Sequence, residues 1–203
     1  MSDKLLLATN NQGKVSEYRS LLQNLPLELV TLIDQGITTV VDEVGESLEE
    51  NARLKATLLA SESQLLALAD DSGLEVVALG GEPGRLSARY AGEGASDRDR
   101  VNYLLSRLKN VPWEKRAACF RCVIAVATPS GEVGLCSGEC WGFITFESRG
   151  DQGFGYDPVF YLLELGKTMA ELPLEIKNRV SHRGKAARKA YQLLKKPPFS
   201  AFS

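Results

Sequence analysis

The 203-residue chain lacks any long run of apolar residues. Its longest uninterrupted apolar stretch, Cys122 to Ala127, is far shorter than the ~18 residues that a membrane-spanning helix needs. The first four residues lead into three leucines without the basic region or the small-residue cleavage site of a secretory signal. The sequence therefore predicts a cytoplasmic protein with no membrane partner.

The chain also lacks an excess of charge of one sign. Its 24 Lys and Arg residues balance 26 Asp and Glu residues to a net charge of −2, which argues against a protein that binds nucleic-acid backbone. The distribution is uneven, because eight basic and no acidic residues lie between Lys177 and Lys196, leaving 16 basic against 26 acidic residues elsewhere. An acidic body with a basic segment suits a metal–polyphosphate ligand, and a solvated basic helix face is the alternative.

Cysteine and histidine are scarce, with four and one residues respectively. Cys119 and Cys122 lie in a predicted strand, where residues three apart point to opposite faces, which argues against a metal-binding knuckle there. The spacing of Cys136 and Cys140 does not have the context of a structural zinc site either, and the histidine is remote in sequence. The four cysteines are expected to be reduced, buried or half-buried thiols.

The hydrophobic pattern predicts a mixed α/β protein in which residues 1–203 form one domain. The predicted strands cover residues 4–9, 27–33, 65–69, 117–128 and 133–146, and the predicted helices begin near residues 14, 47, 97 and 182. Ser47 with Glu50 three residues later has the pattern of a capping box. Pro129-Ser130-Gly131 joins the two long strands into a predicted hairpin.

The first predicted strand runs into a polar turn, Thr9-Asn10-Asn11-Gln12-Gly13, followed by Lys14 at the start of a helix. Backbone N–H groups at a helix N-terminus attract anions, and a lysine adds a full positive charge. The segment does not have the glycine spacing of a Walker loop. It predicts a phosphate-binding turn, with an ordinary polar turn as the alternative.

Asp70-Asp71-Ser72-Gly73 is predicted to end the strand at residues 65–69. Carboxylates at a strand end lie on the rim of a sheet, where α/β proteins bind ligands. Adjacent residues of an extended strand point in opposite directions, so one aspartate is expected to face the site. A solvated turn is the alternative.

The predicted helix after residue 47 carries polar residues within its apolar stripe. The stripe consists of Leu48, Asn51, Ala52, Lys55 and Leu59. A lysine in such a stripe is expected to pair with a carboxylate or a phosphate, unless its amine reaches the edge of the apolar face. Glu43, in an acidic turn just upstream, is expected to reach the same site.

Taken together, the motifs of this chain resemble those of one enzyme family in kind and order. They are Thr9-x-Asn11-x-x-Lys14, Glu49-Glu50-Asn51-Ala52 with Lys55, Ala69-Asp70-Asp71-Ser72-Gly73-Leu74, Pro83-Gly84 with Ser87-Ala88-Arg89-Tyr90-Ala91-Gly92, Gly153-Phe154-Gly155-Tyr156-Asp157-Pro158 and Ser181-His182-Arg183-Gly184-Lys185. The chain is similar over almost its whole length to the inosine/xanthosine triphosphate pyrophosphatases. The resemblance implies an α/β fold with a long, curved mixed sheet, two lobes around a central cleft, and a homodimer. It also implies Mg²⁺-dependent hydrolysis of non-standard purine nucleoside triphosphates (ITP, dITP, XTP) to the monophosphate and pyrophosphate.

The resemblance further implies roles for individual residues. Asp71 would be the general base, and Glu43 and Asp71 would hold the metal. The phosphates would contact Thr9, Asn10, Asn11, Gln12, Gly13, Lys14, Lys55 and Ser72. The nucleotide and its base would contact Phe154, Gly155, Tyr156, Asp157, Lys177, His182 and Arg183.

Two other functions compete with this hypothesis. A related pyrophosphatase acting on modified pyrimidine nucleotides would share the broad architecture, but the Phe154 to Asp157 and His182-Arg183 motifs argue against it. A nucleotide-binding module without turnover is the other alternative, and the intact set of Glu43, Asp71, Lys14 and Lys55 argues against it. A nucleic-acid binder is the least favoured function.

Overall fold

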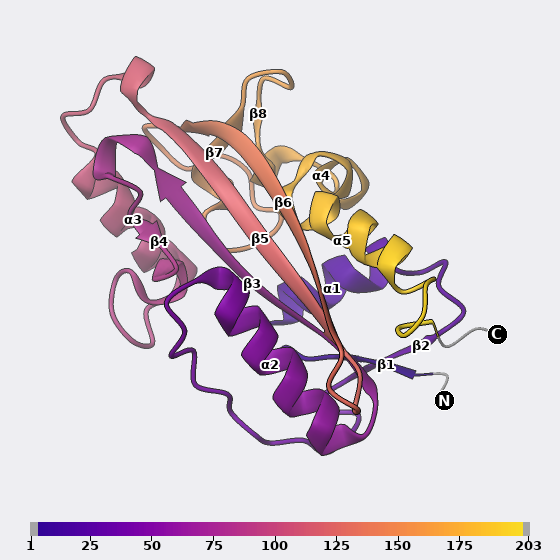
Figure 1. Cartoon of the computed structure of the whole chain (residues 1–203). Helices are drawn as coiled ribbons and strands as arrows, with labels where there is room; N and C mark the ends of the chain where they lie inside the picture. The colour runs from indigo at the N-terminus through magenta and orange to yellow at the C-terminus, as the bar shows by residue number, and fades with distance from the viewer. Residues whose placement is uncertain (1–3, 201–203) are drawn as a thin grey trace. The chain divides into compact units, whose positions relative to one another are not determined.

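The computed structural model describes residues 4–200 (Figure 1). The chain divides into two compact units. The first unit comprises the chain up to Asp71, residues 122–138 and the chain from Arg183 onward. The second unit comprises residues 72–121 and 139–182. The predicted single domain with two lobes around a cleft stays a prediction.

The strands belong to one mixed sheet, in agreement with the predicted α/β class. They are β1 (Lys4–Leu7), β2 (Glu28–Thr31), β3 (Leu66–Val76), β4 (Pro83–Gly84), β5 (Ala117–Ala127), β6 (Val133–Ile144), β7 (Phe160–Leu162) and β8 (Lys167–Thr168). Their order is β2-β1-β3-β5-β6-β7-β8, and β4 pairs with β3. β1 runs parallel to β2 and β3, whereas β4, β7 and β8 join by antiparallel pairing.

In the first unit, helices cover both faces of the sheet (Figure 1). α1 (Gln12–Leu21) and α5 (His182–Leu193) pack on the face that includes Leu5 and Leu7 of β1. α2 (Leu48–Ser63) packs on the opposite face, which includes Leu6. A strand buried on both faces needs apolar side chains at successive positions, which accounts for the continuous leucines of β1.

The second unit has its own apolar core. It is built around Leu74 of β3, Val101 and Leu104 of α3 (Asp97–Arg107), Phe120 of β5 and Phe160 of β7. A short helix, α4 (Leu174–Val180), also belongs to this unit and was not predicted, because seven residues give too little apolar periodicity to recognise.

The predicted end of a strand before Asp70 is wrong, because β3 continues through Asp70-Asp71-Ser72-Gly73 to Val76. Aspartate and glycine favour turns locally, but here tertiary pairing keeps the chain extended. Gly73 permits this, since a Cβ at that position would come within 2.3 Å of the Gly84 carbonyl oxygen on β4. The two aspartates therefore lie within a strand and not at its end.

Other local predictions are confirmed with shifted ends. α1 begins at Gln12, two residues before the predicted position, because the Asn11 side chain caps the helix. Ser47 caps α2 as predicted, but the Glu50 carboxylate accepts a hydrogen bond from the Glu46 N–H. Ser96 caps α3 with a complete capping box.

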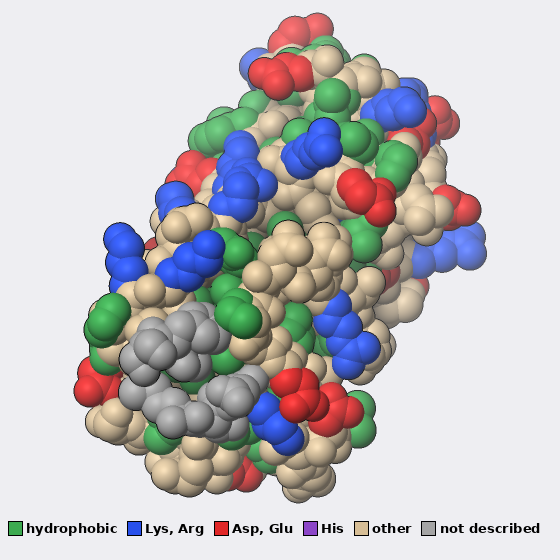
Figure 2. All heavy atoms as spheres, turned by 90° about the vertical axis from the view of Figure 1, so that its right-hand side faces the viewer, with side chains coloured by type: hydrophobic (Ala, Val, Ile, Leu, Met, Phe, Trp, Pro, Cys, Tyr) green, Lys and Arg blue, Asp and Glu red, His purple; other side chains and the backbone are tan. Residues whose placement is uncertain are grey.

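The basic segment between Lys177 and Lys196 contains side chains of two kinds. Lys177 and Arg183 are almost fully buried, at 3% and 2% exposure. The other six are exposed, namely Arg179, Lys185, Arg188, Lys189, Lys195 and Lys196. On the face drawn in Figure 2, Lys and Arg side chains occur as separate groups and not as one continuous patch. Six of the eight basic side chains are therefore exposed, and the other two form buried ion pairs.

Two predicted properties of the residues can be checked directly. All four cysteines are buried free thiols, as predicted. Within residues 4–200, no helix has the length and hydrophobicity needed to cross a membrane.

Candidate active site

Asp71 lies on β3 at the centre of a polar cluster within the first unit. Its Oδ1 is 3.4 Å from the Lys55 Nζ of α2, and its Oδ2 accepts a hydrogen bond of 3.1 Å from the Asn51 side chain. The same ammonium is 2.9 Å from the Glu43 Oε1 and donates to the Asp70 carbonyl oxygen at 2.8 Å. The predicted pairing of Lys55 with a carboxylate is thus observed, and Glu43 reaches the same place.

The electrostatic environment of Asp71 favours a carboxyl group that can accept a proton. Burial raises its pKa above the ordinary value, and the negative charge of Glu43 adds to this effect. The Lys55 charge acts in the opposite direction and does not cancel the rise. A carboxylate with a raised pKa is a stronger base, as a general base in catalysis requires.

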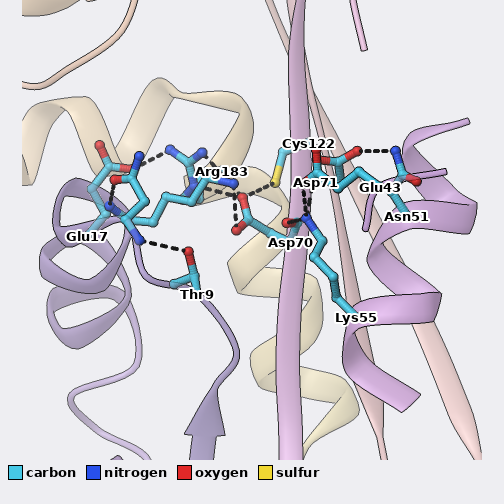
Figure 3. Close-up of polar contacts among 11 residues, drawn as sticks. Thr9, Glu17, Glu43, Asn51, Lys55, Asp70, Asp71, Cys122 and Arg183 are labelled. Carbon is cyan, nitrogen blue, oxygen red and sulfur yellow. Dashed lines mark hydrogen bonds and ion pairs between the residues drawn. The ribbon is translucent and has the colours of Figure 1, made fainter. Parts of the chain in front are cut away.

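Asp70 points to the other side of β3, as strand alternation predicts, and forms a separate buried cluster (Figure 3). Its Oδ1 is 3.0 Å from the Lys14 Nζ, and its Oδ2 is 3.3 Å from Arg183. The Cys122 thiol donates to the same oxygen at 3.8 Å. Burial alone would raise the pKa of Asp70, but the Lys14 and Arg183 charges hold it well below its usual range.

Arg183 comes from the start of α5 and joins α1 to β3. Its guanidinium donates to the Glu17 carboxylate of α1 at 2.7 Å as well as to Asp70. Arg183 is 2% exposed and Glu17 is 3% exposed, so this is a buried ion-pair network. The base contact that the resemblance implies for Arg183 stays a prediction, and the contacts observed here are with these two carboxylates.

The predicted phosphate-binding turn connects β1 to α1 at the surface of the first unit. The Asn11 Oδ1 accepts a hydrogen bond from the Lys14 N–H at 3.0 Å, and the Asn11 N–H donates to the Thr9 Oγ1 at 3.2 Å. Asn10, Asn11 and Gln12 are exposed, and Thr9, Gly13 and Lys14 are half-buried. The N-terminus of α1 is therefore open to an anion.

The predicted base-site residues, except Arg183, lie in the second unit together with Ser72. Asp157 forms a buried ion pair with Lys177, and its Oδ2 also accepts a hydrogen bond of 2.9 Å from the Phe154 N–H. The Lys177 Nζ is 4.9 Å from the centre of the Phe154 ring. These contacts bring Phe154, Asp157 and Lys177 together as one compact group.

The remaining residues of this set are held by neighbouring elements of the second unit. The Tyr156 hydroxyl donates to the Ser87 carbonyl oxygen at 2.9 Å. His182 is buried, and its ring stacks on Phe120 with 4.6 Å between centroids. Ser72 is half-buried on β3, directly after Asp71.

Comparison with known proteins shows to which family the chain belongs. A model of the Ham1 family matches residues 5–193 of the chain. The chain belongs to the Ham1 family. A relative from Geobacter sulfurreducens named dITP/XTP pyrophosphatase is 52% identical over 183 residues, covering 90% of this chain and 92% of that protein. A Desulforamulus reducens protein of the same name is 49% identical and covers 94% and 95% of the two chains.

The fold agrees with solved structures of Ham1 proteins. A HAM1 protein from Coxiella burnetii matches with a TM-score of 0.85 and 38% identity, covering 96% of this chain and 99% of the other. The mixed α/β fold expected from the motifs is thus that of the Ham1 family.

The Ham1 motif residues do not form a complete metal cage. Among residues 4–200, no group of three or more His, Cys, Asp or Glu side chains could hold a metal ion. Glu43 and Asp71 nevertheless converge on one positive charge, the Lys55 ammonium. Mg²⁺ commonly uses one or two carboxylates together with phosphate oxygens and waters, so these two residues fit a Mg²⁺ that arrives with a polyphosphate.

Two residues with clear structural roles at the site were not among the predicted site residues. Asn51 is 2% exposed and links the Gly45 N–H, at 2.8 Å, to Asp71. Its position in the apolar stripe of α2 was a usable signal. Glu17 is buried beside Val15 and Tyr18 on α1, and an acid within an apolar helix face was the corresponding signal.

Proposed function

We propose that this protein is a nucleoside triphosphate pyrophosphatase that hydrolyses ITP, dITP and XTP to the monophosphate and pyrophosphate. Membership of the Ham1 family and two relatives named dITP/XTP pyrophosphatase support this function. The structural observation that carries it is the convergence of Glu43 and Asp71 on Lys55 within one unit. Two acids and an ammonium at one place suit the cleavage of a metal-bound polyphosphate.

The phosphates would bind at the N-terminus of α1 and along the two lysines. The α1 terminus offers N–H donors and the positive end of the helix dipole. Lys14 and Lys55 are partly exposed, at 15% and 13% of their side chains, and each ammonium would contact a phosphate oxygen while keeping its carboxylate partner. Thr9 to Lys14, Lys55 and Ser72 are the proposed phosphate contacts.

Glu43 and Asp71 would hold Mg²⁺, which would neutralise phosphate charge when bound. Asp71 would accept the proton of the water that attacks the α-phosphorus, and its raised pKa supports this role. The Asn51 amide donates to the Asp71 Oδ2 and so keeps the carboxylate oriented. Asp70 would act indirectly, by holding Lys14 in place.

The group around Phe154 would bind the nucleotide and its base. The Phe154 ring offers a stacking surface, and Lys177 and Asp157 hold the backbone next to it. Donors from His182 or the backbone N–H groups of 154–157, all in the second unit, would favour the 6-keto oxygen of inosine and xanthosine. Adenine presents a 6-amino donor instead, and two unmatched donors in a desolvated pocket cost ~1–3 kcal/mol each. A preference of roughly 10² or more for ITP over ATP follows.

We further propose that the protein is a cytoplasmic homodimer. The dimer is implied by the family resemblance, and the four free, buried cysteines support a reducing compartment. Light scattering during gel filtration would measure the mass, and one chain is 22.2 kDa. A particle of that mass would contradict the dimer.

A substrate screen tests the function and separates it from its alternatives. Purified protein with Mg²⁺ is incubated with ITP, dITP, XTP, ATP, GTP and a modified pyrimidine triphosphate, and products are resolved by anion-exchange chromatography. We expect monophosphate and pyrophosphate from the first three, and no turnover after chelation of the metal. Diphosphate and phosphate as products, comparable kcat/KM for ATP and ITP, or preference for the pyrimidine would each contradict the proposal. Binding without turnover would identify a nucleotide-binding module.

A further inference from the structure

Asp157 and Lys177 hold the turn from Gly153 to Asp157 in place. Asp157 accepts the Phe154 N–H and pairs with Lys177, which lies against the Phe154 ring. Gly155 has a φ of +63°, a left-handed conformation that glycine adopts without strain. The Gly155 N–H takes part in a further contact of this turn.

The Gly155 N–H donates a hydrogen bond to a carboxylate on a helix that is distant in sequence. The Gly155 N–H donates to the Asp97 Oδ2 at 2.7 Å, although the two residues are 58 positions apart in the chain. Asp97 is the first residue of α3, and its Oδ1 is paired with Arg100. Arg100 in turn donates to the Ala88 carbonyl oxygen at 3.0 Å. The carboxylate is therefore held in a defined orientation when it meets the turn.

The helix does not need Asp97 as its cap. The Ser96 Oγ accepts a hydrogen bond from the Asp99 N–H at 3.2 Å, and the Asp99 Oδ2 accepts one from the Ser96 N–H at 3.0 Å. This capping box satisfies the N–H groups of Ser96 and Asp99 without a contribution from Asp97. The hydrogen bond between Asp97 and Gly155 is thus independent of the capping box, and it links α3 to the turn.

We infer that Asp97 is a positioning residue for the proposed base site. By fixing the Gly155 backbone, it sets the position of the Phe154 ring and of the neighbouring N–H groups. The inference rests on the proposed function, because it assigns the turn to the base. The observed contacts of Asp97 are with the Gly155 N–H and with Arg100, so its loss should weaken nucleotide binding and base selection more than the chemical step.

Three variants of the full-length chain test the inference: Asp97→Ala, Asp97→Asn and the control Asp99→Ala. Asp97→Ala removes the acceptor, and we expect about a tenfold higher KM for dITP, with kcat within about threefold of wild type and a smaller preference over ATP. A tenfold change in KM is the lower end of what losing a hydrogen bond to a charged group causes. We choose this lower end because the Asp97 side chain is 45% exposed. Asp97→Asn keeps an acceptor oxygen, and we expect it to restore most of the affinity.

Asp99→Ala is the matched control because it removes the Asp99 half of the capping box and keeps the Asp97 carboxylate that contacts the turn. We expect it to lower Tm at least as much as Asp97→Ala while leaving KM for dITP unchanged. An unchanged KM in Asp97→Ala, or an equal rise in Asp99→Ala, would overturn the inference, because the effect would then be absent or due to general loosening of α3.

A second measurement does not depend on turnover. Amide hydrogen exchange followed by NMR reports the Gly155 N–H directly, and we expect about tenfold faster exchange in Asp97→Ala but not in Asp99→Ala. Equal exchange in all variants would overturn the link even in an active enzyme. Failure of the wild type to cleave any purine triphosphate would instead refute the proposed function and leave the exchange result to decide the link.

Discussion

The two adjacent aspartates of β3 should respond in opposite ways to the same nearly isosteric change. Asp70 is enclosed by the positive charges of Lys14 and Arg183, and its side chain is 0% exposed. Asp71 faces Lys55, but its pKa is raised by burial. We expect Asp70→Asn to impair folding and Asp71→Asn to impair turnover.

The expected loss of unfolding free energy in Asp70→Asn follows from the ion pairs that the substitution removes. The substitution leaves the half-buried Lys14 and the buried Arg183 without their shared carboxylate, and breaking a buried pair typically costs 3–5 kcal/mol. Arg183 keeps Glu17 at 2.7 Å, so we take the lower end, about 3 kcal/mol. For a chain of 203 residues this corresponds to a Tm lowered by about 6–12 °C.

Asp71→Asn should leave Tm within about 2 °C of wild type or raise it, because the ionised carboxyl is disfavoured in the folded protein. Lys55 retains the Glu43 carboxylate and the Asp70 carbonyl oxygen. Turnover should fall by about 10²–10⁴-fold, since the proton acceptor and a proposed metal ligand are lost. Differential scanning calorimetry and pyrophosphate release from ITP measure the two effects. Equal loss of Tm in both variants, or an inactive but stable Asp70→Asn, would refute the assignment.

Asp70 and Asp71 should also make the stability of the protein depend on pH in opposite ways in metal-free buffer. The lowered pKa of Asp70 contributes stability above its unfolded value of about 3.9, and this is lost as the pH falls further. The Tm difference between wild type and Asp70→Asn should thus be constant above about pH 5 and narrow below about pH 4. The raised pKa of Asp71 contributes stability at low pH that is lost as the pH rises through the folded value. Wild type should therefore lose stability relative to Asp71→Asn as the pH rises.

Three further substitutions test the surrounding contacts. Lys55→Met leaves two carboxylates without the ammonium between them, so we expect the unfolding free energy to fall by about 2 kcal/mol in metal-free buffer. Added Mg²⁺ should restore part of this loss. If calorimetry gives equal losses with and without Mg²⁺, the result would argue against a metal site there. Asn51→Ala removes a donor to Asp71, and we expect kcat/KM to fall about tenfold, with more Mg²⁺ needed for half-maximal rate; an unchanged Mg²⁺ titration would contradict this role. Lys177→Met removes the cation buried against Asp157, and chemical denaturation should reveal a loss of about 3 kcal/mol. Wild-type stability of that variant would show that the pair is not needed to hold the turn.

The sequence by itself determined the features that depend on residues close together in the chain. Helix caps at Asn11, Ser47 and Ser96 bond to N–H groups three residues away, so local spacing was enough to place the helix starts within two residues. The opposite directions of Asp70 and Asp71 follow from strand geometry in the same way. The order of the motifs along the chain was also specific enough to indicate the family.

Only the tertiary structure decided which distant residues share a charge or a hydrogen bond. Local preference placed a strand end at Asp70, whereas pairing with neighbouring strands carries β3 on to Val76. Arg183 meets Asp70 across 113 positions, and Asp97 meets Gly155 across 58. A spacing pattern carries no information about such contacts, because they depend on how the strands and helices pack. Asp70 lies beside the Lys14 and Arg183 cations and Asp71 faces Lys55, so their distinct roles are properties of the folded chain.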